Sequence, residues 1–182
     1  MPKRHTRHAI KQLPKLWLMT DERFGDRLLP SIAALPRGSG IIFRHYSLER
    51  EARRALFEAV HRMARSKRHM LIVAGDAGIA RLRRVDGYHG RQQAKRLHTA
   101  PAHSLREAIA AERLGADLLF VSPVFATRSH LGEEALGRIR FGLLIRGLKT
   151  PVIALGGMTA KRARGLASMK VQGWAAIDAL II

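Results

Sequence analysis

The sequence of 182 residues contains no cysteine, which excludes disulfide bonds, thiolate metal sites and cysteine nucleophiles. It also has no apolar run near the roughly 20 residues that a helix needs to cross a bilayer. Its first fifteen residues are basic but lack the apolar core of a signal peptide. We therefore expect a cytoplasmic protein with no membrane partner.

Acidic residues are scarce, with 14 Asp and Glu against 33 Lys and Arg, for a formal net charge of +19. Such a positive field attracts phosphorylated metabolites, RNA and acidic lipids alike. The basic residues are scattered along the chain, and only two tyrosines and two tryptophans are available to stack on bases. The charge therefore favours a solvated surface or the steering of a phosphorylated substrate over a dedicated nucleic-acid partner.

Strand-like and helix-like segments alternate along the whole chain, which we interpret as a single domain spanning residues 1–182. Helical spacing of apolar residues predicts a helix over 48–65, and Ser104 with Glu107 forms a capping box that begins a helix over 104–114. Further helices are expected within 133–148 and over 159–168. Strands are expected over 16–19, 41–43, 70–73, 86–90, 118–121, 151–155 and 174–182, with one more that ends at His103.

Continuous apolar strands of this kind are buried on both faces, as in parallel sheets. Roughly eight strand–helix repeats favour a closed (β/α)8 TIM barrel over an open doubly wound sheet. The chain is short for that barrel, which usually takes about 250 residues, so we expect some helices to be shortened or missing. A barrel without its last helix would expose apolar surface that a homodimer would cover.

The active site of such a barrel lies on the loops that follow the strands. Gly156 and Gly157 follow the seventh strand and precede a helix, where backbone N–H groups can approach an anion; the alternative is a plain tight turn. His103 ends the fifth strand and is a candidate general acid and base, or else it is bonded by a neighbouring strand's carbonyl.

Two further features follow strands four and six. His89 has glycines close on either side and is interpreted as structural rather than catalytic. The loop over 122–130 carries hydroxyl and basic side chains, including Thr127 and Ser129, and either wraps an anion or is simply polar.

The order of these motifs resembles that of the thiamine phosphate synthase superfamily, which includes the synthases and the TenI-type thiazole tautomerases. The motifs are AHSLREA at 102–108, GAD at 115–117, PVFAT at 123–127 and PVIALGGMT at 151–159. The resemblance implies a barrel that binds thiazole phosphate and uses His103 as the acid and base. The residues it implies for substrate and phosphate binding are Arg44, Ser104, Thr127, Ser129, Gly156 and Gly157.

Departures from the family pattern separate its two branches. A synthase uses magnesium to neutralise the leaving pyrophosphate, yet Ala74 and Gly75 stand where synthases carry an Asn-Asp metal pair. Of the synthase motif Gln-x-Arg-x-Lys only Arg44 is present, and His130 replaces a lysine in the loop after strand six. The tautomerase needs no metal and keeps His103, so the resemblance favours a thiazole tautomerase with no cofactor.

Asp178 stands where the family has a phosphate-binding serine, and its carboxylate repels phosphate unless it points away or an arginine neutralises it. Three hypotheses remain open. The favoured one is a thiazole-phosphate tautomerase. The second is a thiamine phosphate synthase with a diverged site, and the third is a non-catalytic protein that binds a phosphorylated ligand or RNA.

Overall fold

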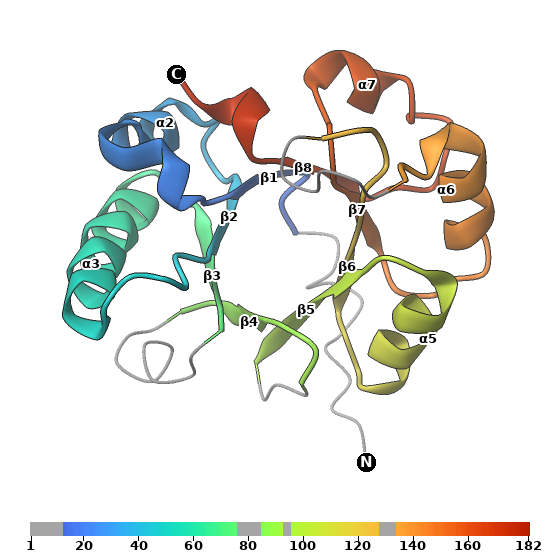
Figure 1. The fold of residues 1–182 in the computed structure, drawn as a ribbon, viewed down its shortest axis with the longest axis horizontal. Coiled ribbons are helices and arrows are strands. Elements are labelled where there is room, and N and C mark those ends of the chain that lie inside the picture. Colours follow the sequence, from blue (N-terminus) through green and yellow to red (C-terminus); the bar gives the residue numbers. More distant parts are fainter. Residues whose placement is uncertain (1–12, 76–84, 93–95, 128–133) are drawn as a thin grey trace.

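Eight parallel strands close into a barrel in strict sequence order, β1 through β8, with β8 paired to β1 (Figure 1). The computed structural model describes residues 13–75, 85–92, 96–127 and 134–182. The strands are β1 (Leu16–Met19), β2 (Gly40–Phe43), β3 (Met70–Ala74), β4 (Gly87–His89), β5 (Leu97–Ala102), β6 (Leu118–Val121), β7 (Val152–Ala154) and β8 (Gly173–Ala176). The expected TIM barrel is confirmed.

The helices pack outside the barrel, with α2 and α3 on one flank and α5, α6 and α7 on the other (Figure 1). Their bounds, with two 3₁₀ segments, are η1 (Glu22–Arg27), α2 (Leu28–Ala34), α3 (Arg50–Ser66), α5 (Leu105–Arg113), α6 (Gly137–Ile145), α7 (Ala160–Arg164) and η3 (Asp178–Leu180). Several are short, as the chain length predicts. Among the described residues no helix is long and apolar enough to span a membrane.

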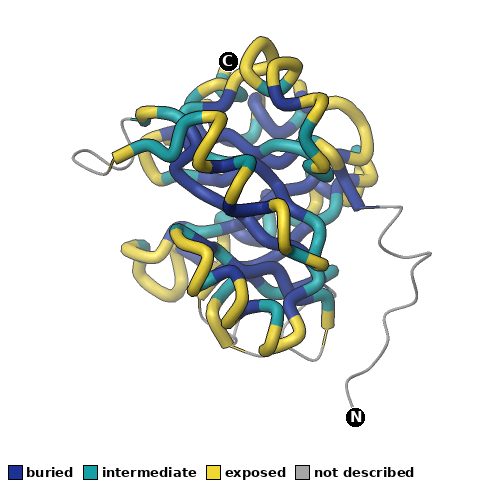
Figure 2. Tube along the Cα trace, turned by 90° about the vertical axis from the view of Figure 1, so that its right-hand side faces the viewer, coloured by how far each residue is buried: buried dark blue, intermediate teal, exposed yellow. Residues whose placement is uncertain are grey.

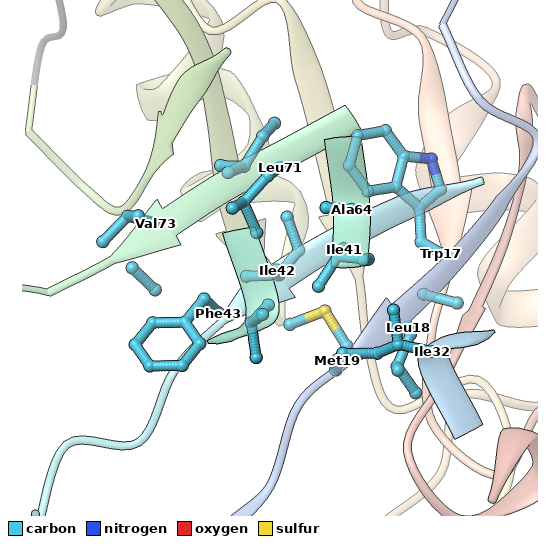
Figure 3. Close-up of a cluster of buried hydrophobic side chains, with 14 of the residues drawn as sticks. Trp17, Leu18, Met19, Ile32, Ile41, Ile42, Phe43, Ala64, Leu71 and Val73 are labelled. Carbon is cyan, nitrogen blue, oxygen red and sulfur yellow. The ribbon is translucent and has the colours of Figure 1, made fainter. Parts of the chain in front are cut away.

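The barrel interior and the layer beneath the helices form the buried core, which runs through the middle of the molecule in Figure 2. In Figure 3, Trp17, Ile41, Ile42 and Leu71 from β1, β2 and β3 lie together with Ile32 of α2. The Trp17 ring also meets Phe120 of β6 edge to face, with ring centroids 5.4 Å apart. This contact joins opposite sides of the barrel, so the strands form one closed unit.

The last strand is shorter than the expected 174–182. Strand β8 ends at Ala176, where its ladder to β1, which begins at Leu16–Trp174, closes with the pair Leu18–Ala176. The chain then turns into η3 at Asp178. The apolar run 179–182 resembled a strand by composition alone, and pairing decided otherwise.

Helix α7 is also shorter than the expected 159–168. Thr159 is its N-cap as predicted, since its hydroxyl accepts the Arg162 N–H at 3.2 Å. The regular α-helix ends at Arg164, next to Gly165. Glycine has a weaker helix propensity than any residue except proline. Beyond Gly165 the Leu166 N–H donates to the Ala163 carbonyl in a tighter turn.

The homodimer expected from the sequence stays a prediction.

Candidate functional site

A cavity of about 330 Å³ opens at the carboxyl ends of the strands, where β6, β7 and β8 meet. Four of the residues that sequence analysis singles out line it, namely Arg44, Thr127, Gly156 and Gly157. Asp178 forms part of its wall as well. The Gly-Gly turn, the loop after β6 and the position of Asp178 are thus brought together. Ser129 lies outside the described residues.

The turn at Gly156 and Gly157 has a backbone that only glycine adopts readily, with φ of 90° and 59°. A Cβ on Gly156 would meet the Pro123 Cα at 2.6 Å, and one on Gly157 would meet the Phe125 carbonyl oxygen at 2.9 Å. The loop after β6 is held against this turn, since the Phe125 N–H donates to the Gly156 carbonyl at 3.0 Å. The close approach of the two segments explains both glycines.

The N–H groups of Gly156 and Gly157 have no hydrogen-bond acceptor within the part of the chain that the structure describes. The adjoining carbonyls of Leu155 and Gly156 do accept bonds, from Val124 and Phe125. Backbone amides grouped at a turn without protein acceptors are the usual donors to a bound anion. The cavity therefore has the donors that an anionic group needs.

His103 directly follows β5, is half-buried and is not among the residues that line the cavity. Its Nδ1 lies 3.1 Å from the carbonyl oxygen of Ser122, a residue that lines the cavity. A carbonyl can only accept, so a hydrogen bond to it places a proton on Nδ1; the Ser122 hydroxyl also lies 3.4 Å from Nδ1. This contact is the neighbouring-strand carbonyl that sequence analysis gives as the alternative to a catalytic role, and the catalytic role of His103 stays a prediction.

Ser104 is the N-cap of α5, and the binding role that the resemblance implies for it stays a prediction. Its hydroxyl accepts the Glu107 N–H at 3.2 Å as the N-cap of α5, and Glu107 in turn accepts the His103 N–H at 2.9 Å. The predicted capping box is confirmed. Ser104 is exposed and is not among the residues that line the cavity.

Arg44 reaches the cavity but is already bonded to protein oxygens. Its Nε donates to the Thr20 carbonyl at 2.7 Å, and its terminal nitrogen lies 3.0 Å from the Asp21 carboxylate. Burial lowers the pKa of Arg44, and the Asp21 charge partly offsets that effect. Burial raises the pKa of Asp21, but the hydrogen bonds and charge of Arg23, with the charge of Arg44, lower it overall.

The charge of Asp178 is matched by an arginine, one of the two arrangements that would reconcile it with a bound anion. An Arg23 terminal nitrogen lies 3.5 Å from the Asp178 carboxylate, and Arg23 also bonds Asp21 at 2.7 Å. Charges of alternating sign therefore follow one another along the rim of the cavity, in the order Asp178, Arg23, Asp21 and Arg44. Sequence analysis missed Arg23 as a member of the site.

His89 lies fully inside the barrel beneath the site. Its Nδ1 is 2.9 Å from the Thr99 hydroxyl, and its ring meets Phe120 edge to face at 5.2 Å. Burial, reinforced by the charge of Arg44, lowers the pKa of His89 to about 3. The ring is therefore neutral at physiological pH, which agrees with a structural role.

Magnesium prefers several oxygen ligands gathered at one place, and the described residues hold no such group. Ala74 and Gly75, at the end of β3, bring no side-chain oxygen to the site. No group of three or more His, Asp and Glu side chains gathers anywhere in the described ranges. Asp76 lies outside those ranges. A synthase-type magnesium site does not fit the donor set at this edge of the barrel.

Curated relatives extend over most of the chain. It is 28% identical over 167 residues to a putative thiamine-phosphate synthase 2 of Aquifex aeolicus, covering 84% of this chain and 90% of the relative. It is 32% identical over 147 residues to the thiamine-phosphate synthase of Geobacillus thermodenitrificans, covering 74% and 66%. These names support the synthase alternative better than the favoured tautomerase.

Solved structures agree on the fold. The barrel superposes on a thiamine phosphate pyrophosphorylase from Pyrococcus furiosus with a TM-score of 0.77 and 23% identity, over 93% of this chain and 87% of that one. An N-acetylmannosamine-6-phosphate 2-epimerase from Clostridium perfringens follows with a TM-score of 0.67 and 14% identity, over 99% and 93%. The family model described as thiamine monophosphate synthase matches residues 17–180. With barrel, glycine turn and motif order in agreement, the chain belongs to the thiamine monophosphate synthase family.

Proposed function

We propose that the cavity binds the phosphate ester of a thiazole and that the chain acts on the bound thiazole by proton transfer. The observation that carries this proposal is the pair of N–H groups at Gly156 and Gly157, which line the cavity and lack acceptors within the described residues. A phosphate placed there would meet backbone donors that need no rearrangement. Thr127, in the same cavity wall, adds a hydroxyl.

Proton transfer is the chemistry that the histidine geometry supports. Nε2 of His103 is the basic nitrogen, because Nδ1 is held by the Ser122 carbonyl at 3.1 Å. The base would remove a proton from one position of the thiazole ring and return it at another, as a tautomerase does. This reaction needs no co-substrate and has no leaving group.

The test follows isomerisation of the thiazole carboxylate phosphate by NMR. We expect His103→Ala to slow the reaction by about 10² to 10⁴-fold, the range typical of a lost general acid–base group. His61→Ala is the matched control, since His61 lies on α3 away from the cavity and should retain the wild-type rate. An unchanged thiazole with wild-type protein would overturn the proposed reaction.

The second candidate is thiamine phosphate synthesis, which the names of the relatives favour. This reaction joins thiazole phosphate to a pyrimidine pyrophosphate and releases pyrophosphate. It predicts pyrophosphate release that requires both substrates and magnesium and that disappears when either substrate is omitted. Release at a steady rate with no isomerisation would replace the tautomerase with the synthase.

Ligand binding without either reaction defines the third alternative, a non-catalytic binder. Titration calorimetry with thiazole phosphate separates it from the two enzymes, because binding would persist while both activity assays stay silent. RNA binding would in addition weaken steeply as salt is raised.

A further inference from the structure

Arg162 of α7 lies over the cavity from the side of the glycine turn. Its guanidinium carbon is 4.7 Å from the centroid of the Phe125 ring, and one terminal nitrogen donates to the Gly157 carbonyl. Arg162 also lines the cavity together with Gly156 and Gly157. The side chain is thus held in place by a ring on one segment and a carbonyl on another.

Arg162 differs in its ion pairing from the other charged residues around the cavity. Arg44 is paired with Asp21, and Asp178 is paired with Arg23. No carboxylate among the described residues forms an ion pair with Arg162. Of the two arginines that line the cavity, Arg162 is therefore the one whose charge no carboxylate of the described residues balances.

The contacts of Arg162 also suit a second partner. A guanidinium has five N–H donors in a planar fork, and the Gly157 carbonyl occupies one nitrogen. The guanidinium carbon lies over the Phe125 ring, and the Arg162 side chain makes no other hydrogen bond among the described residues. Two N–H groups along one edge match two oxygens of a phosphate.

We propose that Arg162 binds the phosphate of the ligand and makes the cavity prefer phosphorylated over unphosphorylated molecules. The inference rests on the proposed function, since it assigns the side chain that recognises the phosphate in the same cavity. It also explains how an anion is held near Asp178: the carboxylate is matched by Arg23, and Arg162 adds an unmatched positive charge on the turn side.

Titration calorimetry on Arg162→Gln tests the assignment with three probes: thiazole phosphate, the corresponding thiazole alcohol and inorganic phosphate. We expect the variant to bind thiazole phosphate and inorganic phosphate about tenfold more weakly, the loss typical of one charge-assisted contact, and the alcohol as wild type does. Arg164→Gln is the matched control, because Arg164 lies on the same helix and is exposed like Arg162 but does not line the cavity. It should change affinity by less than about twofold.

Each result decides between the assignments. If Arg162→Gln behaves like Arg164→Gln toward thiazole phosphate, the role of Arg162 is overturned while the proposed ligand stands. If wild type binds inorganic phosphate through Arg162 but not thiazole phosphate, the proposed ligand fails and the role of Arg162 stands. Equal losses for the phosphate and the alcohol would assign Arg162 to shaping the cavity and overturn its phosphate role. Wild type that binds none of the probes overturns both proposals.

Arg162→Lys keeps the positive charge but lacks the planar fork of the guanidinium, so it should recover only part of the affinity. This partial recovery would show that the loss in Arg162→Gln is not a folding defect.

Discussion

The carboxyl ends of β1, β2 and β3 differ sharply from those of β6, β7 and β8, although the barrel places both at one mouth. In the first region polar groups bond one another. The Thr20 hydroxyl accepts the Arg44 backbone N–H at 3.0 Å and lies 3.1 Å from Nδ1 of His45. Burial lowers the pKa of His45. In the second region the glycine-turn amides have no acceptor among the described residues.

Arg53 illustrates how the first region is stabilised from within. This arginine of α3 is only 6% exposed and donates to the Arg44 carbonyl at 3.0 Å and to the Ala74 carbonyl at 2.8 Å. It thereby ties the ends of β2 and β3 together. The difference between the regions teaches that polar groups at a barrel mouth are not all alike: many in the first region bond the strand ends to one another, whereas the turn amides of the second have no acceptor among the described residues.

The largest expected effect comes from breaking the first region with Arg53→Met. Two buried carbonyls would lose their donor, which we expect to lower the free energy of unfolding by about 4 kcal/mol. Arg54→Met, at an exposed neighbour on the same helix, should change it by less than about 0.5 kcal/mol. Urea unfolding followed by circular dichroism gives both values. Equal stabilities of the two variants would show that the carbonyl bonds of Arg53 contribute nothing.

A smaller loss of stability, joined to a loss of binding, is expected from Gly157→Ala in the second region. A Cβ there would collide with the Ala126 carbonyl oxygen, and the residue has a positive φ. We expect a cost of about 3 kcal/mol and loss of phosphate-ester binding. Gly38→Ala is the control: its φ is also positive, 81°, but nothing lies within 4 Å of its Cβ, so it should cost about 1 kcal/mol and bind normally. Normal binding by Gly157→Ala would remove the turn from the site.

The smallest effect concerns His89, which lies between the two regions inside the barrel. Its folded pKa of about 3 lies below the unfolded value near 6.5, so the unfolded chain takes up the proton first as pH falls. The contribution of the neutral His89 ring to the free energy of unfolding is complete above pH 6.5 and declines toward pH 3. Between pH 7 and 5.5 it falls by about 1 kcal/mol. His89→Gln should therefore lose less stability than wild type over that interval in thermal melts. Parallel curves would mean that His89 is not held neutral.

Much of the fold was predictable because its signals are local. The capping box of Ser104 and Glu107 sets the start of α5 within four residues, and apolar runs mark the strands wherever they are continuous. The prediction was wrong at 177–182, because strand pairing stops at Leu18–Ala176 and a strand needs a partner. The binding role predicted for Ser104 stays a prediction; its hydroxyl caps α5, and Ser104 is not among the residues that line the cavity.

The sequence by itself determined the eight-stranded barrel, the place of the Gly156–Gly157 turn and the position of His103 after β5, because periodicity, turn residues and caps act over a few neighbouring residues. Only the tertiary structure decided that Asp178 pairs with Arg23, that Arg53 bonds the ends of β2 and β3, and that Arg162 lies on the Phe125 ring over the cavity. These contacts join segments that meet when the barrel closes, and no local spacing encodes them.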